Sequence, residues 1–547
     1  MAHERIPSRR PLVLGRAGAV ATSHPLATLA GLDALRAGGT AADACVAAAA
    51  MLNVVEPMST GIGGDAFALV WDAKSRKLSA LNGSGRAPSG ATLASYRERG
   101  WRRVPMTGFA PITVPGSARA WEDLLRAHGR LGLAQALGPA IERAERGFEV
   151  SEMVAANWAA TAAKLAKESE AARVYLPAGR APRLGETVRF PDLAKTFRVV
   201  ADGGAAAFYE GEFARRLLDE MRSRGASWTA ADLSGHRSTW DEPISVTYRG
   251  HRVFECPPNG QGLAALSALS ILEGIRLGSR LDADGLHAQI EAMKLGFADT
   301  HRYVADPAFG EVPVSELLDA RYVAERRALL DPRRAADRLT PGAVAAGRDT
   351  VYLCAVDREG NAVSFINSLY YGFGSAVVVP GTGVCLQNRG AGFSLDPGHP
   401  NRLEPGKRPF HTIIPAMLFG PGPMERGPLA PFGVMGGPMQ PQGHLQVVCN
   451  LVDFALDPQQ ALDAPRFRVV VNADEADEGS RPDHEVMLET GLAWAAEDLA
   501  RRGHHLVPAG DARFGGFGGG QIIRIDPESG VRAAGSDPRK DGLALAE

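Results

Sequence analysis

The chain has 547 residues, of which 45% are hydrophobic and 22% charged, and 60 Lys and Arg nearly balance 62 Asp and Glu to leave a net charge of −2. This balance argues against a nucleic-acid binder, which needs a basic face. No window approaches 18 consecutive apolar residues, so the sequence predicts no membrane span. A chain this apolar can bury a large core, which excludes disorder as its main state.

The amino-terminal stretch and the cysteines both favour a cytoplasmic protein. Residues 1–18 include four arginines but an apolar run of only three or four residues, whereas a secretory signal needs 7–15. The five cysteines are scattered, and no pair has the spacing of a metal site or a C-x-x-C motif, so we expect buried, reduced thiols.

The first half of the chain is predicted to be mainly helical. A helix over 29–37 ends at Gly38-Gly39, and Thr40 with Asp43 three residues later predicts a capping box that opens a helix over 41–54. Residues 117–300 read as mostly helical, and 325–349 as a loose connector rich in Arg, then Pro, Ala and Gly. The other predicted elements are strands at 65–72 and 77–82 and amphipathic helices at 117–128, 135–146, 261–275 and 282–302.

After residue 349 the pattern changes to short apolar runs typical of strands. Strands are predicted at 351–356, 362–369, 376–379, 383–387, 411–418, 430–435, 521–526 and 530–534, and helices at 440–455 and 490–502. Because helices dominate the first half and strands the second, with both present in each, we expect layered α/β packing.

One predicted hairpin carries two hydroxyl side chains. Strands on either side of the turn 357–361, with a loop centred on Glu359, pair residues whose numbers sum to 718, which places Thr350 opposite Ser368. A two-residue loop would give another register. A Thr–Ser cross-strand pair is also common as a purely structural contact, so spacing alone does not assign a function.

A second feature is the pair Gly436-Gly437, which follows the strand 430–435 and shortly precedes an apolar-periodic helix. Two glycines there can turn backbone N–H groups toward one point near the positive end of a helix dipole, an arrangement that suits an oxyanion. A tight turn without further function is the alternative reading.

These features, with further motifs along the whole chain, resemble the γ-glutamyltransferase family of N-terminal-nucleophile (Ntn) hydrolases. The motifs are Asp349-Thr350, Val356-Asp357, Gly360-Asn361-Ala362-Val363, Glu56-Pro57, the run from Gly61 to Phe67, Val114-Pro115-Gly116, Pro257-Pro258-Asn259-Gly260, Phe373-Gly374-Ser375, Lys407-Arg408-Pro409, Gly436-Gly437, Ala464-Pro465-Arg466 and Ser536-Asp537-Pro538-Arg539.

The resemblance implies a fold and a mechanism. It implies an α/β Ntn-hydrolase αββα sandwich, with two stacked central sheets flanked by helices, made as a precursor that cuts itself between Asp349 and Thr350. Residues 1–349 and 350–547 would then be a large and a small subunit of one structural unit. Thr350 would be the nucleophile, with its freed α-amine as base. Ser368 would orient it, and Gly436 and Gly437 would bind the oxyanion.

The chain departs from the glutamyl-specific members where they hold the substrate's α-carboxylate and α-ammonium. Their Arg falls at Ser84, with Arg86 two residues later, and their Ser-Ser pair falls at His411-Thr412. The remaining family residues, Asn, Gln and Asp, fall at Tyr370, Arg389 and Gly392. Since Arg389 would repel an ammonium, we hypothesise an acyl donor that carries a carboxylate but lacks the α-amino group. An internal ion pair for Arg389 is the alternative.

The sequence therefore predicts an enzyme that hydrolyses or transfers the acyl group of a γ-glutamyl-like amide, as a glutathione hydrolase does, through an ester on Thr350. Hydrolysis of oxamate or another small anionic amide, a glutaryl-type acylase activity, and an uncleaved non-catalytic scaffold are the alternatives. The expected partners are a small amide and an amine or amino-acid acceptor. No cofactor is expected, and no metal site, because His24, His128, His301 and His411 lack a ligand spacing.

Overall fold

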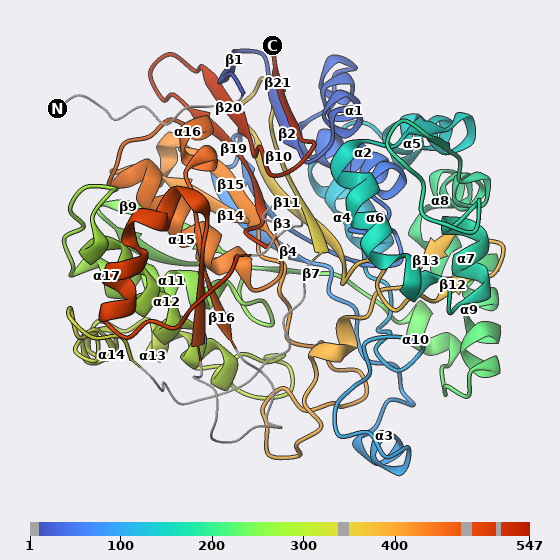
Figure 1. The fold of residues 1–547 in the computed structure, drawn as a ribbon. Coiled ribbons are helices and arrows are strands. Elements are labelled where there is room, and N and C mark those ends of the chain that lie inside the picture. The colour runs from blue at the N-terminus through green and yellow to red at the C-terminus, as the bar shows by residue number, and fades with distance from the viewer. Residues whose placement is uncertain (1–9, 337–348, 472–483, 510–515) are drawn as a thin grey trace.

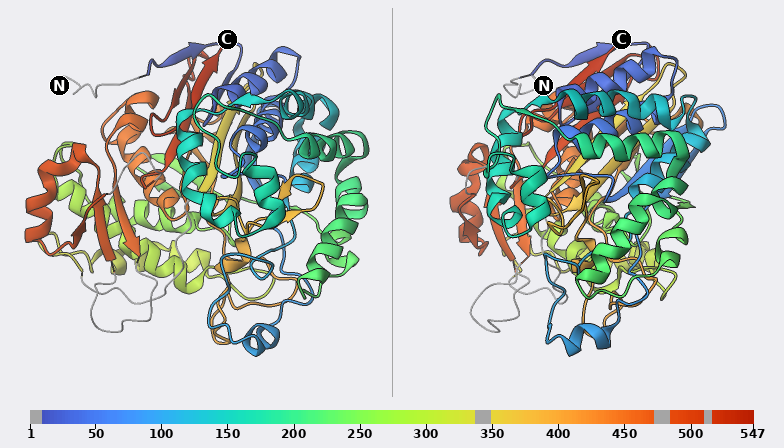
Figure 2. Two further views of the ribbon diagram at one scale, coloured as in Figure 1. Left: turned by 45° about the vertical axis from the view of Figure 1, so that its right-hand side comes forward. Right: turned by 90° about the vertical axis from the view of Figure 1, so that its right-hand side faces the viewer.

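The computed structural model describes residues 10–336, 349–471, 484–509 and 516–547. Two seven-stranded sheets lie face to face between two groups of helices, and the views in Figures 1 and 2 place the helices of the first 240 residues on one side and α11–α17 on the other. This is the αββα arrangement that the sequence predicted.

The first sheet has the strand order β21-β2-β10-β11-β3-β4-β7 and joins neighbours only by antiparallel pairs. Its strands are β2 Ala19–Thr22, β3 Asp65–Asp72, β4 Lys77–Asn82, β7 Thr239–Asp241, β10 Asp349–Val356, β11 Ala362–Tyr370 and β21 Leu543–Ala546. Strands from before and after the Asp349–Thr350 bond are hydrogen-bonded side by side in this sheet, so neither part alone supplies all of its strands.

The second sheet has the order β1-β20-β19-β15-β14-β9-β8 and is likewise antiparallel throughout. Its strands are β1 Val13–Gly15, β8 Ile244–Tyr248, β9 His251–Glu255, β14 Ala416–Phe419, β15 Ala430–Met435, β19 Gly519–Ile525 and β20 Arg532–Ser536. It too combines strands from both parts of the chain.

Helices cover the outer face of each sheet. Over the first sheet lie α1 Pro25–Arg36, α2 Ala41–Val55, α4 Ser117–His128, α5 Leu133–Arg146 and α8 Pro191–Glu210, and over the second lie α11 Gly262–Glu273, α12 Ala283–Tyr303, α15 Met439–Val452 and α16 Pro458–Asp463. The remaining elements are α3 Leu93–Glu98, α6 Glu152–Leu165, α7 Ser169–Tyr175, α9 Glu212–Ser223, α10 Ala230–Ser234, α13 Val314–Leu317, α14 Ala320–Arg327, α17 Ala496–Arg501, the 3₁₀ turns η1 Arg389–Gly392, η2 Met424–Arg426 and η4 Thr490–Ala495, and the short strands β5 Phe148–Glu149, β6 Thr187–Val188, β12 Val378–Val379, β13 Val384–Cys385, β16 Phe467–Val471, β17 His484–Leu488 and β18 Leu506–Val507.

The central strands are buried on both faces because they separate two hydrophobic layers. In β10, Val351, Leu353 and Ala355 pack under the helices, whereas Tyr352 and Cys354 face the other sheet. This alternation follows from the two-residue repeat of a strand. It explains why β10 and β11 read as nearly continuous apolar runs rather than as alternating polar and apolar residues.

Most predicted elements are present, with two informative differences. Residues 239–255, expected within a mostly helical region, form β7, β8 and β9 instead, and the turn at Arg249-Gly250, both at positive φ, joins β8 to β9. The strand expected from 411 begins only at Ala416. Before it, His411 hydrogen-bonds the backbone of Asn259 and Gln261, outside the sheet.

The predicted helix over 490–502 begins as the 3₁₀ turn η4 and becomes α17 only at Ala496. The connector expected over 325–349 begins inside α14, and most of its second half lies outside the described residues. Within the described part of the chain, no helix is long and apolar enough to cross a membrane.

A buried ion pair joins the second sheet to the small sheet of β16, β17 and β18. The Arg466 guanidinium donates to Asp537 Oδ2 at 2.7 Å, and both side chains are buried. Burial alone would raise the pKa of Asp537, but the Arg466 and Arg539 cations and two backbone N–H groups hold it below its usual value. Asp537 therefore stabilises the fold above its unfolded-state pKa, and this stabilisation is lost as the pH falls through the lower folded-state pKa.

We predict that Asp537→Asn lowers the free energy of unfolding by about 3–5 kcal/mol, because it leaves the Arg466 charge buried and unpaired. Denaturant unfolding at neutral pH measures the change, with the exposed Glu528→Gln as control. Equal stability of the two variants would show that the Arg466–Asp537 pair does not contribute to the free energy of unfolding as predicted.

Candidate functional site

The site is built around the hairpin of β10 and β11. The register from Val351–Asn367 to Val356–Ala362 has the predicted sum of 718, and a shift follows between Asp349 and Val351. The Thr350 and Ser368 hydroxyl oxygens lie 3.0 Å apart, and both side chains are buried. The predicted contact between the two hydroxyls is therefore present. Strand β10 includes both Asp349 and Thr350.

The Ser368 hydroxyl is held by two further groups. Its oxygen accepts a hydrogen bond from the Tyr370 backbone N–H at 2.9 Å and lies 3.4 Å from a terminal nitrogen of Arg389. Because two donors are directed at this oxygen, the Ser368 hydroxyl can act as the donor toward Thr350 Oγ1. If Ser368 is the donor in this hydrogen bond, the Thr350 proton can be taken by a base on the other side of its hydroxyl.

Arg389 is a fully buried cation next to the two hydroxyls. Its Nη1 donates to Thr412 Oγ1 at 2.7 Å, and the guanidinium carbon lies 4.0 Å from the centre of the Tyr370 ring. Its Nε has no hydrogen-bond partner, and within the described residues no carboxylate lies within 4.0 Å of the guanidinium. Burial lowers the pKa of Arg389 to about 10, against the effect of Tyr370 and Asp65, so it stays charged at neutral pH. The alternative of a direct internal ion pair is not realised among these residues.

The Asp65 carboxylate accepts hydrogen bonds from four segments of the chain. It lies opposite Ser368 in the register of β3 and β11. Oδ1 accepts from the Gln387 side chain at 2.9 Å and from the N–H groups of Gly85 and Gly116 at 3.0 and 3.1 Å. Oδ2 lies 3.0 Å from His411 Nε2. Burial raises the pKa of Asp65 to about 6, although Arg389 and the hydrogen bonds oppose this.

His411 is a neutral imidazole with both nitrogens engaged. Burial, together with the Arg389 and Arg408 cations, lowers its pKa well below the usual value. The Ile413 N–H donates to Nδ1 at 3.3 Å, so Nε2 carries the hydrogen and donates it to Asp65. Both hydrogen bonds fix the orientation of the His411 ring, so neither nitrogen is available as a base.

The two glycines connect to the same network through Gln261. Gly436 and Gly437 follow β15 with φ of 121° and 59°, backbone conformations that residues other than glycine rarely adopt. The Gln261 side chain donates to the carbonyls of Gly437 at 2.9 Å and of Thr412 at 2.7 Å. Hydrogen bonds therefore lead from Gly437 through Gln261, Thr412 and Arg389 to Ser368.

The predicted residues Ser84 and Arg86 have different surroundings. Ser84 is buried, its hydroxyl accepts from the Asn259 side chain at 3.1 Å, and its carbonyl accepts from Arg408 at 3.2 Å. Arg86 donates to the Arg237 carbonyl at 3.2 Å, and the structure records no side-chain contact between it and the other predicted site residues it describes. The structure thus brings together Thr350, Ser368, Tyr370, Arg389, His411 and Thr412, but not Arg86.

Sequence reasoning missed the residues that connect these groups. Asp65 and Asn259 belong to the family motifs, but no role is predicted for them from the sequence, and no pattern points to Gln387 or Gln261. Asp65 follows Gly63-Gly64 at the start of a strand, which is the signal that pointed to it. The amide side chains carry no comparable signal, since their partners are mostly backbone carbonyls far away in the sequence.

We predict that Asp65→Asn changes the pH dependence of stability. The raised pKa means that the folded chain binds this proton more tightly than the unfolded chain, so wild type loses stability as the pH rises from 4 through 6. In the variant, this decrease in the free energy of unfolding should be smaller by about 3 kcal/mol. Urea unfolding between pH 4 and 7 measures it, with the exposed Glu311→Gln as control. Parallel curves for wild type and Asp65→Asn would rule out the titration.

Comparison with known proteins gives consistent matches over the whole chain. The model of the family described as gamma-glutamyltranspeptidase matches residues 27–547. The glutathione hydrolase-like YwrD proenzyme of Bacillus subtilis is 37% identical over 97% of this chain and 99% of its own, and the oxamate amidohydrolase proenzyme of Klebsiella pneumoniae is 34% identical over 96% and 98%. The crystal structure of a cephalosporin acylase from Bacillus halodurans superposes with a TM-score of 0.90 at 45% identity, covering 100% of this chain and 99% of that one.

Proposed function

Because the chain belongs to the gamma-glutamyltranspeptidase family, and so is an Ntn-type amide hydrolase or acyl transferase, we propose that Thr350 is its nucleophile and that its acyl donor carries a carboxylate but no α-ammonium. The observation that carries the proposal is the buried Arg389 cation, 3.4 Å from Ser368 Oγ and without a carboxylate within 4.0 Å among the described residues.

The proposed reaction begins with cleavage of the precursor. Attack of Thr350 Oγ1 on the Asp349 carbonyl would convert the peptide bond into an ester, and hydrolysis of this ester would free the α-amine of Thr350. An α-amine with an ordinary pKa of about 8 can accept the hydroxyl proton near neutral pH, which a Lys amine cannot. The 3.0 Å contact with Ser368 supports an oriented hydroxyl.

In turnover, Thr350 Oγ1 would attack the substrate amide carbonyl while its proton passes to the α-amine. The backbone N–H groups of Gly436 and Gly437 would stabilise the oxyanion. As the carbon–nitrogen bond breaks, the proton passes from the α-amine to the leaving amine. Water, or an acceptor amine, then attacks the Thr350 ester and restores the hydroxyl. Each proton that leaves the nucleophile is returned, so this cycle balances without a cofactor.

The charges around Arg389 support selection of an anionic acyl group. The Thr412 hydroxyl accepts from Arg389, so its own proton is available to a substrate carboxylate. Arg389 Nε, which has no partner, is a second donor for that carboxylate. An ammonium about 4 Å from the guanidinium would be repelled by about 4 kcal/mol at an effective dielectric constant of 20. An anionic acyl group without an amine is attracted by the Arg389 guanidinium and carries no ammonium to be repelled.

A short acyl chain is a second candidate, favoured by the position of Arg389. Its nearest nitrogen is separated from Thr350 Oγ1 by two hydrogen-bond lengths through Ser368. A carboxylate bonded directly to the scissile carbonyl, as in oxamate, or one carbon removed from it would reach both groups. A glutaryl chain would have to fold back. The names of the relatives include both kinds of activity, an oxamate amidohydrolase and a cephalosporin acylase.

We also propose that the cut chain stays together as a large and a small subunit in the cytoplasm. Each sheet combines strands from both parts of the chain, which supports the first statement. The five cysteines, all free and buried, support the second.

The nucleophile is tested by mass. Dividing the 57.8 kDa chain in proportion to residues 1–349 and 350–547 gives pieces of about 37 and about 21 kDa. We expect both pieces in purified wild type and a single uncut chain in Thr350→Ala. Intact-mass analysis measures this. An uncut wild-type chain without amidase activity would instead favour a scaffold, and a cut Thr350→Ala chain would assign the cleavage to another residue.

Specificity is tested with the mono-p-nitroanilides of glutaric, succinic and oxalic acid, compared with γ-glutamyl-p-nitroanilide. We expect wild type to prefer the donors without an amine. Arg389→Gln should lower kcat/KM for them by roughly 10–100-fold, since a charged hydrogen bond contributes about 1.5–3 kcal/mol, and should shift preference toward the glutamyl donor. The exposed Arg321→Gln should leave all rates unchanged. A strong glutamyl preference in wild type would contradict the proposal.

A further inference from the structure

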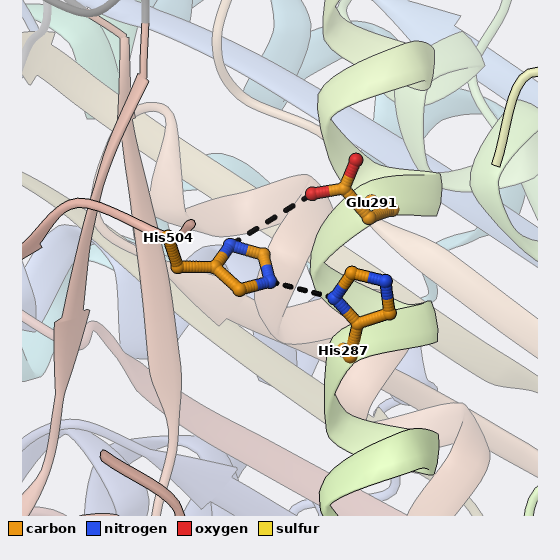
Figure 3. A group of neighbouring side chains, drawn as sticks. All are labelled: His287, Glu291 and His504. Carbon is orange, nitrogen blue, oxygen red and sulfur yellow. Dashed lines mark hydrogen bonds and ion pairs between the residues drawn. The ribbon is translucent and has the colours of Figure 1, made fainter. Parts of the chain in front are cut away.

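Three potential metal ligands outside the candidate site converge between α12 and the turn that precedes β18. His287 and Glu291 are one helical turn apart on α12, so they share a face. His504 faces them from the other part of the chain, as Figure 3 shows, and all three side chains are buried. One ligand atom of each lies within 4.8 Å of the others, the only such group in the described ranges.

The hydrogen bonds determine which nitrogens carry a lone pair. His287 Nε2 lies 2.8 Å from the Asp331 carbonyl, which can only accept, so this nitrogen carries the hydrogen. In the neutral ring Nδ1 is then an acceptor, and its partner at 2.7 Å, His504 Nε2, must be the donor. His504 Nδ1 is therefore left with a lone pair as well.

That second lone pair has an unusual environment. His504 Nδ1 is buried without a hydrogen-bond partner among the described residues, and it faces Glu291 Oε1 at 3.8 Å. A lone pair and a carboxylate oxygen that face each other are both acceptors, so neither can donate to the other. Two ligands bound to one Zn²⁺ at about 2.0–2.2 Å each would be separated by a distance of this order.

We propose that His287, Glu291 and His504 bind one divalent transition-metal ion of the Zn²⁺ class. Two imidazole nitrogens and a carboxylate form the mixed N/O set that such ions prefer. In the tautomers derived above the lone pair of His504 lies on Nδ1, whereas His287 Nδ1 accepts from His504 Nε2. One ion can therefore bind both rings only if the His504 ring turns and gives up that hydrogen bond. The Asp331 carbonyl keeps its bond to His287 Nε2, the outer-shell contact by which metal-bound histidines are usually oriented.

Lys294 is the group that competes with the ion. Its ammonium is buried and donates to Glu291 Oε1 at 2.8 Å and to the Ala336 carbonyl at 3.4 Å. A metal ion at Glu291 Oε1 must displace it. Replacing Lys294 by an apolar side chain of similar length removes this competition, so the proposal predicts a gain of affinity in that variant and not only losses in others.

The position of the site gives it a structural role. The Ala336 N–H donates to Glu291 Oε2, and the Ala335 N–H donates to the Arg502 carbonyl beside His504. The cluster thus joins α12, residues 331–336 and the segment that carries His504. Since Asp349–Thr350 lies between the last two in sequence, an ion here would link both products of the proposed cleavage near the end of the connector.

The test is zinc binding to the purified, EDTA-treated protein, followed with a competing fluorescent chelator. We expect about one Zn²⁺ per chain in wild type and in His505→Ala, an adjacent exposed histidine outside the cluster. Affinity should fall at least tenfold in His504→Ala and Glu291→Gln, and should rise in Lys294→Met. Co²⁺ in place of Zn²⁺ should give the visible absorption of a site with nitrogen ligands.

Absence of zinc binding in wild type, or equal binding in wild type and His504→Ala, would overturn the proposal. If His504→Ala does not fold, as judged by circular dichroism, Lys294→Met decides, because unchanged or weaker binding there would overturn it as well. Binding is measured on Thr350→Ala too. Since this readout needs no catalysis, its result is independent of the proposed reaction.

Discussion

The geometry of the site depends on one buried carboxylate, that of Asp65. Burying a charge without partners is very costly, and Asp65 is stabilised by hydrogen bonds from Gly85, Gly116, Gln387 and His411, which come from four separate segments. These hydrogen bonds therefore hold the four segments together around Asp65. Two of them continue directly into Arg389 and Thr412, so the groups proposed to bind substrate are positioned by a residue that need not touch it.

The hairpin of Thr350 and Ser368 was predictable because its information is local. The apolar runs of β10 and β11 and the turn at 357–361 lie within about twenty residues, and a strand's two-residue repeat turns a loop length into a register. Asp357 closes this turn by accepting from the Asn361 side chain and backbone. The capping box of Thr40 and Asp43 was predictable for the same reason, since both its hydrogen bonds lie within four residues.

The remaining features depend on contacts between segments distant in sequence. Strands β8 and β9 have weak local signals, and β9 is held in place by β14, more than 150 residues later. The ties that Gln261 makes to Thr412 and Gly437 end on backbone carbonyls, which leave no pattern in side-chain types. His287 and His504 are 217 positions apart, so no ligand spacing could reveal them.

The residues proposed to bind the substrate are one coupled set and not a series of independent positions. The Arg389 charge is buried because the Tyr370 ring and the Thr412 hydroxyl both face its guanidinium. A glutamyl pocket would need an acid at Gly392, but a Cβ there would lie 3.1 Å from the Phe410 carbonyl oxygen. The Phe410 backbone is in turn held by Asn401, which also bonds the Gly392 carbonyl. Restoring an ammonium site would therefore require the loop around Asn401 to move together with Gly392, Tyr370 and Arg389.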